Sequence, residues 1–245
     1  MSRRRPAARF HDLIRAGTTV FLEKSYRRAQ ISDIAREMGV APGTIYLYVE
    51  SKEALFDLIL RASVDAHVVE GINLPIPTRR PDEILTFIQV ELSAESSIEA
   101  LERALLDRRP SDPSAEIALI VRELYAKASR RWLSLKLIER SAPDWPELAA
   151  LWFGGHRLRL LDQLSRYLQM RMTDQVLRPA PNPVIAARLI LELVATFAIH
   201  CRTEPNSVQA DQSLAEETVV DAVVHAYARS PQRAGSRVRS RRDPS

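Results

Sequence analysis

Apolar residues recur at intervals of three and four throughout the long segments of this 245-residue chain, and they nowhere alternate with polar residues as they do in a strand. The first segment shows the pattern with Phe10, Leu13 and Ile14, which lie on one face of a helix of about five turns. Glycine is scarce, at 7 residues, which disfavours the tight turns that join β-strands. These features predict an all-α protein of one or two domains.

Proline and glycine divide the remainder of the chain into further predicted helices. Gly71, Pro75, Pro77 and Pro81 make the segment 72–81 a loop. The predicted helices that follow the first fifty residues lie near 55–69, 82–93, 97–108, 114–140, 146–173, 183–202 and 214–229. We therefore expect most of the chain to form a helical bundle.

Two short helical patterns meet at a tight turn near residue 40. The first covers Ile31 to Met38, and the second begins at Pro42. Gly39 can adopt the left-handed backbone that ends a helix, and proline suits the first position of the next helix, where its missing N–H costs nothing. The apolar residues that would hold the two helices at an angle are Ile34, Ala35, Val40 and Ile45. The pattern predicts a helix-turn-helix.

The second of these helices has four side chains available to face outward, namely Thr44, Tyr46, Leu47 and Tyr48. Hydroxyl, phenol and apolar groups suit contacts with phosphate oxygens, base edges and thymine methyls in a major groove. One tyrosine could instead be a core aromatic, but residues two apart on a helix point about 200° apart, so both are hard to bury. Lys52 follows the predicted cap Ser51, in a first helical turn where a phosphate partner would explain a cation.

Charge is divided unevenly along the chain, although the formal net charge is only +4. Residues 1–62 hold 11 Lys and Arg against 7 Asp and Glu, whereas residues 63–228 hold 18 against 23. A basic N-terminal region favours a polyanion such as DNA as its partner. Residues 230–245 are rich in arginine and predict a disordered tail. This tail and an arm at Arg3, Arg4 and Arg5 could contact DNA, or both could be solvated basic segments.

The residues of the helix-turn-helix carry a family resemblance. Over roughly residues 7–60 the chain resembles the DNA-binding signature of the tetracycline-repressor (TetR) family of transcription regulators, at Ile34-Ala35, Gly39-Val40, Gly43-Thr44-Ile45-Tyr46, Tyr48 and Ser51-Lys52-Glu53-Ala54-Leu55. The resemblance implies an all-helical homodimer whose N-terminal helices bind an operator and whose C-terminal domain binds a small effector. It also implies that Gly43, Thr44 and Leu47 approach bases, and that two tyrosines and Lys52 hold phosphates. The complete set assigned to DNA is Ser32, Pro42, Gly43, Thr44, Tyr46, Leu47, Tyr48 and Lys52.

The chain departs from the usual family pattern at several positions. Ser25 stands in place of the glycine that commonly ends the first helix, and Gln30 and Ala41 stand in place of capping hydroxyl residues. Losing a cap hydroxyl costs about 1 kcal/mol, and Gly17 inside the first helix costs roughly 0.5 to 1 kcal/mol relative to alanine. None of these departures removes a residue assigned to DNA.

The segment from Val184 to Cys201 is nearly all apolar apart from one stripe of polar residues, which are Arg188, Glu192, Thr196 and His200. A helix whose polar residues form only one stripe must bury the rest of its surface against the core of its own subunit and against a further partner. The segment 214–229 has a similar surplus of apolar positions. We therefore predict a homodimer through helices near 183–202 and 214–229, with a large monomeric core as the alternative.

An effector pocket would be built from aromatic and polar residues of the C-terminal region. The candidates are Tyr125, Trp132, Trp145, Trp152, Phe153 and His156. These residues suit a small hydrophobic ligand, although aromatics at helical spacing are also typical of a core. The stretch with Glu139, Pro143 and Trp145-Pro146-Glu147-Leu148 is similar to the C-terminal domain of the AefR-like regulators of multidrug efflux.

Other classes of protein find little support in the sequence. It has no phosphate-binding glycine loop, nucleophile elbow or His-Glu-x-x-His motif, so we expect neither a catalytic site nor a cofactor. The five histidines form no close pair, and His200 and Cys201 would diverge by about 100° on a helix, so we expect no metal site. With one cysteine, no secretory signal and no run of about 18 apolar residues, the chain is expected to be cytoplasmic and not to enter a membrane.

The sequence thus predicts a helix-turn-helix domain over 1–55, a helical effector-binding and dimerisation domain over 56–229, and a disordered basic tail over 230–245. We interpret the protein as an effector-responsive dimeric repressor of transcription that binds an inverted-repeat operator. One alternative is a DNA-binding architectural or partner-regulated factor without an effector, which the absence of a ligand-sized cavity would favour. Another is an enzyme of unrecognised type whose basic N-terminal region makes protein contacts.

Overall fold

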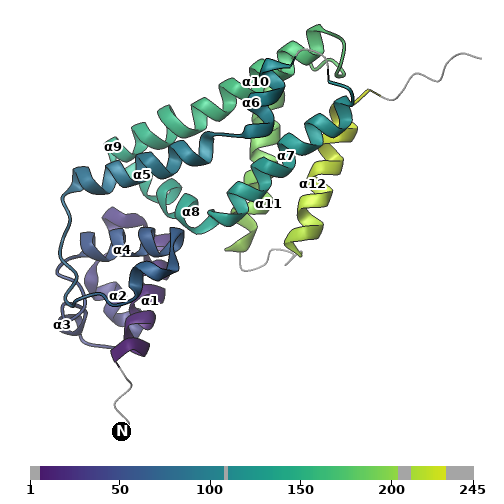
Figure 1. The fold of residues 1–245 in the computed structure, drawn as a ribbon. Helices are drawn as coiled ribbons and strands as arrows, with labels where there is room; N and C mark the ends of the chain where they lie inside the picture. Colours follow the sequence, from purple (N-terminus) through teal and green to yellow (C-terminus); the bar gives the residue numbers. More distant parts are fainter. Residues whose placement is uncertain (1–5, 108–109, 204–210, 230–245) are drawn as a thin grey trace, which may run out of the picture.

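The computed structural model of the protein describes residues 6–107, 110–203 and 211–229. Over these ranges the fold is all-helical, as predicted, with two isolated bridges as its non-helical pairings. The helices form two parts, a small head made of α1–α4 and a longer body made of α5–α12 (Figure 1). The predicted tail 230–245 and the arginines Arg3, Arg4 and Arg5 lie outside the described residues.

The head comprises α1 (Pro6–Arg28), α2 (Ile31–Met38), α3 (Pro42–Ile45) and α4 (Lys52–Val64). Gly17 lets α1 approach α4 closely, because a Cβ at this position would lie 2.8 Å from Ile59 Cδ1. Glycine within α1 therefore serves a close contact between helices. The helix predicted over 55–69 is wrong in its bounds, because α4 ends at Val64 and a separate short turn covers Ala66–Val69. Asp65 begins that turn by accepting a hydrogen bond from the His67 backbone N–H.

The predicted helix-turn-helix is present in α2 and α3. Gly39 ends α2 with a φ of 68°, the left-handed conformation expected of it, and Pro42 occupies the first position of α3. The small core between the two helices consists of Ile34, Ala35 and Ile45, all buried, with Val40 packed against them.

A long connection between α4 and α5 returns along the head before the body begins. Within it, the Ile76 N–H donates to the Tyr48 carbonyl at 2.8 Å, and the Glu50 N–H donates to the Ile76 carbonyl at 3.0 Å. Further along, the Arg79 side chain forms an ion pair with Asp57 of α4 at 3.1 Å. We call residues 72–80 the strap. They connect the start of α5 to the residues that directly follow α3.

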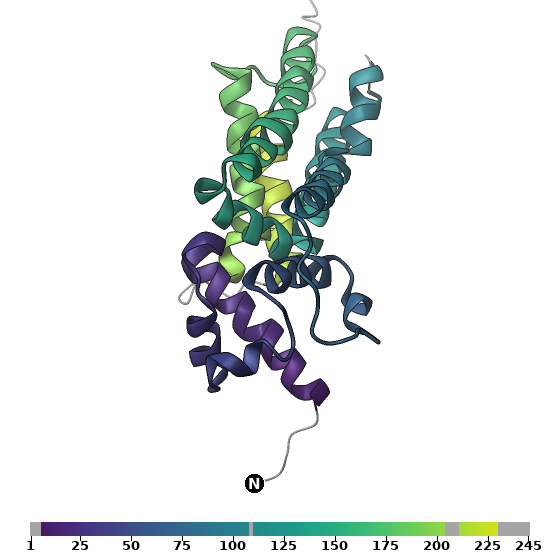
Figure 2. The ribbon, with the colours of Figure 1, turned by 90° about the vertical axis from the view of Figure 1, so that its left-hand side faces the viewer.

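The body comprises α5 (Pro81–Ser96), α6 (Glu99–Leu106), α7 (Pro113–Arg130), α8 (Trp132–Ser141), α9 (Pro146–Ala149), a π-helix (Ala150–Arg157), α10 (Leu158–Thr173), α11 (Pro183–Ala198) and α12 (Gln212–Tyr227). In both views of the ribbon these helices extend away from the head (Figures 1 and 2). The single helix predicted over 114–140 is wrong, because the chain breaks at Arg131 between α7 and α8. That break lets the Arg131 guanidinium donate to the Val64 carbonyl, 2.7 Å away at the end of α4.

A buried ion pair joins three helices of the body. The fully buried Arg171 of α10 donates to both carboxylate oxygens of Glu116 on α7, at 2.8 and 2.7 Å. It also donates to the Ala104 carbonyl of α6 at 2.9 Å. The network supplies polar partners for most of a charged side chain that is withdrawn from water.

The most apolar helix of the described chain is α11, which packs against α7, α10 and α12. With the turn that follows, the 20 residues Pro183–Arg202 are long and apolar enough to cross a membrane by length and composition alone. Several large apolar side chains of α11 and α12 are nevertheless exposed, namely Val184, Ile185, Leu189 and Leu214. These belong to the surplus of apolar positions noted in the sequence.

Candidate functional site

The tip of the head exposes the short helix α3 and the residues just after it. Leu47 is 68% exposed and Tyr46 is 51% exposed, although large hydrophobic side chains are normally covered. Most of the other residues assigned to DNA are also accessible: Ser32, Pro42 and Gly43 are exposed and Thr44 is half-buried. The structure thus brings these residues together on the helix-turn-helix.

Tyr48 does not share this exposure, so the prediction that it faces outward is wrong. Only 7% of the residue is exposed, and its ring stacks on Phe10 of α1 with centroids 6.3 Å apart. The reason is geometric, since residues two positions apart point to nearly opposite sides of a helical turn and Tyr46 takes the outer side. One tyrosine is therefore at the surface and the other belongs to the core of the head.

Lys52 is held by the head itself. Its Nζ donates to the carbonyl oxygens of Ala29 at 3.0 Å and Arg27 at 3.3 Å, and it lies 4.8 Å from the centroid of the Tyr26 ring. Burial lowers the pKa of this ammonium. One carbonyl group from the last turn of α1 and one just after this helix compensate the charge, so a phosphate is not needed to explain a cation at the start of α4. The assignment of Lys52 to DNA stays a prediction.

Side chains bond free backbone N–H groups at the start of two helices of the head, once through the predicted residue and once through a different one. Ser51 caps α4 by accepting a hydrogen bond from the Ala54 N–H at 3.1 Å, as predicted. At the start of α2, where Gln30 replaces a capping hydroxyl residue, the Asp33 carboxylate accepts from the Gln30 N–H at 3.1 Å. Lys24 contacts the same carboxylate at 2.7 Å, and this contact lowers the pKa of Asp33.

A group of residues that we call the latch connects the end of α1 to the body. Ser25 has φ 68° and ψ 164°, a backbone conformation that is essentially restricted to glycine. Its hydroxyl donates to Asp144 at 2.6 Å, and Arg28 forms an ion pair with the same carboxylate at 3.2 Å. Arg140 donates to the Leu22 and Glu23 carbonyls of α1 at 3.1 and 2.7 Å. The latch is therefore Ser25, Arg28, Arg140 and Asp144.

Trp145 follows the latch directly and was predicted to line a pocket for an effector. It lines a pocket between head and body with Tyr26 and Lys52, and its ring lies 5.1 Å from that of Tyr26 and 6.4 Å from that of Phe56 between centroids. Its position next to Asp144 places it in the contact between head and body. That contact had no signal in the sequence, because it joins residues that are far apart along the chain.

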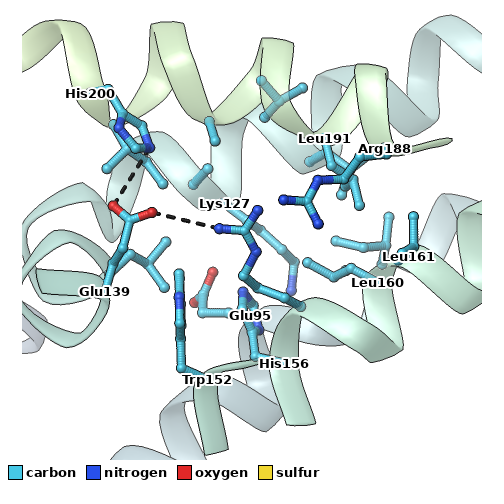
Figure 3. A pocket seen from close by; sticks show the side chains of 18 residues that line it. Glu95, Lys127, Glu139, Trp152, His156, Leu160, Leu161, Arg188, Leu191 and His200 are labelled. Carbon is cyan, nitrogen blue, oxygen red and sulfur yellow. Dashed lines mark ion pairs between the residues drawn. The ribbon is translucent and has the colours of Figure 1, made fainter. Parts of the chain in front are cut away.

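The body contains a cavity of about 90 Å³ between α7, α8, α10, α11 and the π-helix. Its walls are mainly leucine, isoleucine, valine and alanine side chains, with Trp152 and His156 from the π-helix (Figure 3). Two of the six predicted pocket residues therefore line it. The π-helix is a rare conformation that often marks functional sites, because its wider turn redirects side chains.

The other predicted pocket residues lie elsewhere. Tyr125 is buried in the core, where its hydroxyl donates to Gln212 of α12 at 3.2 Å. Trp132 lies under the Arg202 guanidinium, 5.7 Å from its ring centroid, and Phe153 is 49% exposed. Their burial or exposure follows from which face of its helix each residue occupies, and aromatic character alone does not reveal that face.

His156 is fixed as a neutral group at one wall of the cavity. Burial lowers its pKa to about 4, and its ring stacks on Trp152 with centroids 5.1 Å apart. Its Nδ1 lies 2.7 Å from the Ser96 hydroxyl and 3.2 Å from the Leu92 carbonyl oxygen. The Leu92 oxygen can only accept, so this contact favours the tautomer with the proton on Nδ1.

Two buried polar atoms at the cavity residues lack hydrogen-bond partners. They are the indole nitrogen Nε1 of Trp152 and the carboxylate oxygen Oε2 of Glu95. Burial raises the pKa of Glu95, against the opposing effect of Lys127 and Arg131. An unsatisfied buried polar group costs about 1 to 3 kcal/mol.

Charged residues surround the side of the cavity that α11 forms. Arg188 of this helix pairs with Glu192 at 2.6 Å, and Arg157 pairs with the same carboxylate. His200 lies 3.6 Å from Glu139 (Figure 3). Arg157 also lies 3.6 Å from Glu139. Arg188, Glu192 and His200 belong to the polar stripe found in the sequence. The polar stripe therefore indicated this part of the site in the sequence. The sequence did not reveal that the stripe faces a cavity.

No group of three or more histidine, cysteine, aspartate or glutamate residues is arranged to hold a metal ion in the described part of the chain. Cys201 is half-buried. The chemistry that the cavity offers is therefore an apolar wall, hydrogen-bonding groups and a charged rim.

Comparison with known proteins identifies the head. Residues 13–59 match the family described as bacterial regulatory proteins, tetR family, which confirms the resemblance found in the sequence. Over 53 residues the chain is 43% identical to the fatty acid metabolism regulator protein of Bacillus subtilis (strain 168), a match that covers 22% of this chain and 26% of that protein. The matched stretch spans about a quarter of the length of this relative, so it concerns the head alone.

Solved structures resemble most of the chain at low sequence identity. The ketosteroid transcriptional regulator KstR2 of Mycobacterium tuberculosis is 12% identical, with a TM-score of 0.52 and coverage of 93% of this chain and 98% of that chain. The TetR family transcriptional regulator PfmR from Thermus thermophilus is 15% identical, with a TM-score of 0.49 and coverage of 87% and 97%. Identity at this level establishes the fold alone. These matches do not test the similarity to the AefR-like regulators, which stays a prediction.

Proposed function

The head of this chain is a DNA-binding domain of the tetR family of bacterial regulatory proteins, and from this premise we propose that the protein is a dimeric, effector-responsive repressor of transcription. Its head reads an inverted-repeat operator, and its body binds a small molecule that releases the DNA. The domain boundaries that we propose are 1–55 for the helix-turn-helix domain and 56–229 for the effector-binding and dimerisation domain, so the boundary falls within α4.

The observation that carries this proposal is the exposed tip of α3. Tyr46 and Leu47 are large side chains that the head leaves in solvent, directly after the short helix that Ile45 anchors to the core. A short helix presented in this way fits a major groove, with Leu47 suited to a thymine methyl and Tyr46 to a phosphate. Ser32, Pro42, Gly43 and Thr44 extend the proposed contact surface.

A dimer through α11 and α12 supports the reading of an inverted repeat. One recognition helix contacts only a few base pairs, so a twofold pair is needed to define an operator. The exposed apolar side chains Val184, Ile185 and Leu189 on α11 and Leu214 on α12 would be covered by the same helices of a second copy.

Two contacts give the cavity a route to the head. Arg131 forms an ion pair with Glu95 at 3.4 Å and donates to the carbonyl of Val64, the last residue of α4. The π-helix that carries Trp152 also follows α9, Trp145 and the latch residue Asp144 along the chain. A ligand that shifts Glu95 or the π-helix would therefore act on both ends of the contact between head and body.

The experiment that tests this function is the selection of genomic DNA fragments by the purified protein at about 150 mM salt, where attraction to phosphates alone is weakened. We expect enrichment of one inverted repeat, and we expect Leu47→Ala and Tyr46→Ala to reduce it while the variants remain folded. Glu83→Gln on α5, far along the chain from α3, serves as the control variant. If folded wild-type protein enriches no sequence, the proposal is wrong.

A further inference from the structure

Tyr26 is bound by both parts of the molecule. The non-helical backbone of Ser25 breaks α1 just before it, and the Tyr26 N–H donates to the Ser141 hydroxyl of the body at 3.3 Å. The Tyr26 ring lies 5.1 Å from that of Trp145, also in the body. On the head side, the Tyr26 hydroxyl donates to the Glu53 carboxylate at 2.8 Å. A single residue thus connects the end of α8 to the first turn of α4.

Lys52, in the same turn of α4, depends on the same stretch of α1. Its Nζ lies 4.8 Å from the centroid of the Tyr26 ring and donates to the carbonyl oxygens of Arg27 and Ala29. These three partners lie within four consecutive positions of the chain. A shift of Tyr26 therefore also moves the groups that hold Lys52.

The hydrogen bond between Tyr26 and Glu53 has a fixed direction. Burial and this hydrogen bond raise the pKa of Tyr26, so the phenol keeps its proton and acts as the donor. A hydrogen bond to a charged acceptor is stronger than one between neutral groups. The contact therefore orients the first turn of α4 relative to the end of α1.

The first turn of α4 is close to the exposed tip of the head. Glu53 is six positions after Leu47, and between them Ser51 caps α4. A displacement of this turn is therefore passed to the residues that directly follow α3. The contact of Arg131 with Val64, by comparison, acts on the opposite end of α4. The two connections to the body thus differ in the end of the helix that they control.

The pocket between head and body gives the rings of Tyr26 and Trp145 space to move. It has a volume of about 470 Å³, and both rings line it together with Lys52, Glu53 and residues of α5. A closely packed core leaves no room for a second arrangement of a ring, whereas an open pocket of this size does. A shift of the two rings is therefore possible without repacking the buried core of the head.

Trp145 is connected along the chain to the cavity of the body. It directly precedes α9, which continues into the π-helix that carries Trp152 at the cavity wall. Rigid secondary elements transmit displacements between sites. A movement of the π-helix therefore reaches Trp145, and through its ring it reaches Tyr26.

We propose that Tyr26 is a positioning residue that couples the body to the recognition helix. Held by Ser141 and Trp145, it keeps the first turn of α4, and with it the residues after α3, in the orientation that binds DNA. Movement of Trp145 into the pocket between head and body releases this orientation. The inference deepens the proposed function and rests on it, since it states how the body regulates the head.

The first test follows Lys52 by NMR in the full chain without DNA. The chain has four lysines, which are Lys24, Lys52, Lys127 and Lys136. Protein labelled with ¹³C in its lysine side chains therefore gives few signals to assign. The signal of the Lys52 ε-methylene group should be displaced from that of free lysine, because nuclei near the face of an aromatic ring sense the field that the ring induces.

Substitutions of tryptophan in the body assign this displacement. Trp145→Leu should reduce it, because Tyr26 loses the ring that holds it. Trp145→Phe keeps an aromatic ring and should preserve it. Trp132→Leu is the matched control, since Trp132 contacts Arg202 and does not line the pocket between head and body, and it should leave the Lys52 signal unchanged.

The second test measures affinity for the inverted repeat that the wild type selects. We expect Trp145→Leu to weaken binding about fivefold or more, and Tyr26→Leu to weaken it at least as much. Since Trp145 acts through Tyr26, the double variant should bind as tightly as Tyr26→Leu alone. Trp145→Phe and Trp132→Leu should bind as the wild type does. Urea denaturation shows whether each variant is folded under the assay conditions.

Three results would overturn the coupling: an unchanged Lys52 signal in folded Trp145→Leu, losses of affinity that add in the double variant, or equal losses in Trp145→Leu and Trp132→Leu. If Trp145→Leu does not fold, Ser141→Ala replaces it in both measurements, because it removes the acceptor of the Tyr26 N–H.

The two measurements separate the coupling from the proposed function. An inverted repeat recovered without any effect of Trp145→Leu would leave the repressor intact and refute the coupling alone. The NMR measurement needs no DNA. If no repeat is recovered, the repressor is refuted, and the Lys52 signal still shows whether Trp145 acts on the first turn of α4.

Discussion

The head and the body treat their buried polar groups differently. Within the described residues, all four buried side-chain polar atoms without partners lie in the body, at Glu95, Trp152, Gln163 and Arg171. The head, by contrast, compensates even the half-buried ammonium of Lys52 with backbone carbonyl groups. A part that is complete by itself is suited to presenting a fixed surface, whereas a part with unmet hydrogen bonds is suited to receiving a ligand.

The largest change in stability is expected for a substitution of Arg171 in the body. Arg171→Met would leave the Glu116 carboxylate without its buried partner, so we expect the free energy of unfolding to fall by about 3 to 5 kcal/mol. Denaturation in urea measures the change. Arg166→Met, on the same helix but largely exposed, should change stability by less than about 0.5 kcal/mol. Equal losses in the two variants would show that the buried network of the body has no special role.

The two tyrosines of the helix-turn-helix offer a matched pair within the head. Tyr48→Ala removes a buried ring that stacks on Phe10 and should lower stability by about 3 kcal/mol. Tyr46→Ala removes an exposed ring, so it should leave stability within about 0.5 kcal/mol of the wild type while weakening operator binding severalfold. Thermal unfolding and a DNA titration measure both properties. A loss of stability in Tyr46→Ala but not in Tyr48→Ala would mean that Tyr46 is the buried ring and Tyr48 the exposed one.

His156 should make the stability of the body depend on pH. Its pKa falls from 6.5 in the unfolded chain to about 4 in the folded protein, so the unfolded chain binds a proton first as the pH drops. We therefore expect stability to decrease between about pH 6.5 and pH 4, by up to about 3 kcal/mol, and this contribution to level off below pH 4.

The pH dependence can be assigned with two variants. His156→Phe keeps a planar ring and should flatten this part of the stability profile. His67→Gln changes an imidazole that is 81% exposed, and it should leave the profile as it is in the wild type. A profile that His156→Phe does not alter would show that this imidazole is not the group responsible.

The smallest effect concerns the seam between the two parts, at Ser25. Ser25→Ala and Ser25→Gly both remove the hydrogen bond to Asp144, but only glycine adopts the observed backbone conformation without strain. We expect the glycine variant to be more stable than the alanine variant by about 1 kcal/mol, as measured by urea denaturation. If alanine were the more stable of the two, the strain assigned to this position would be absent.

The sequence predicted the head much better than the body because the head depends on local patterns. Gly39, Pro42 and Ser51 act on neighbours within a few residues, and each occupies the predicted position in the structure. The outward orientation predicted for Tyr48 was wrong because its partner Phe10 comes from outside the short helical motif. The contact between Lys52 and the Ala29 carbonyl was not predicted for the same reason.

In the body the decisive contacts are distant in sequence, so aromatic residues could be counted but not placed. Trp152 and Trp145 are close in sequence, yet one lines the cavity and the other contacts the head. The polar stripe of α11 was visible as a period of four. Its partners Arg157 and Glu139 come from other helices, and a single sequence provides no means of pairing them.

The strap limits how the head can rotate relative to the body. The head is fastened to the body by the packing of α1 and α4 on α8, by the latch at Asp144 with Trp145 beside it, and by the strap, where Ile76 pairs with Tyr48 and Glu50. A rigid part held at three separate points has no free axis of rotation, whereas a part held at two can only turn about the line that joins them. Opening the latch alone would therefore leave the head held by α1, α4 and the strap, so the recognition helix would keep its orientation until these contacts also shift.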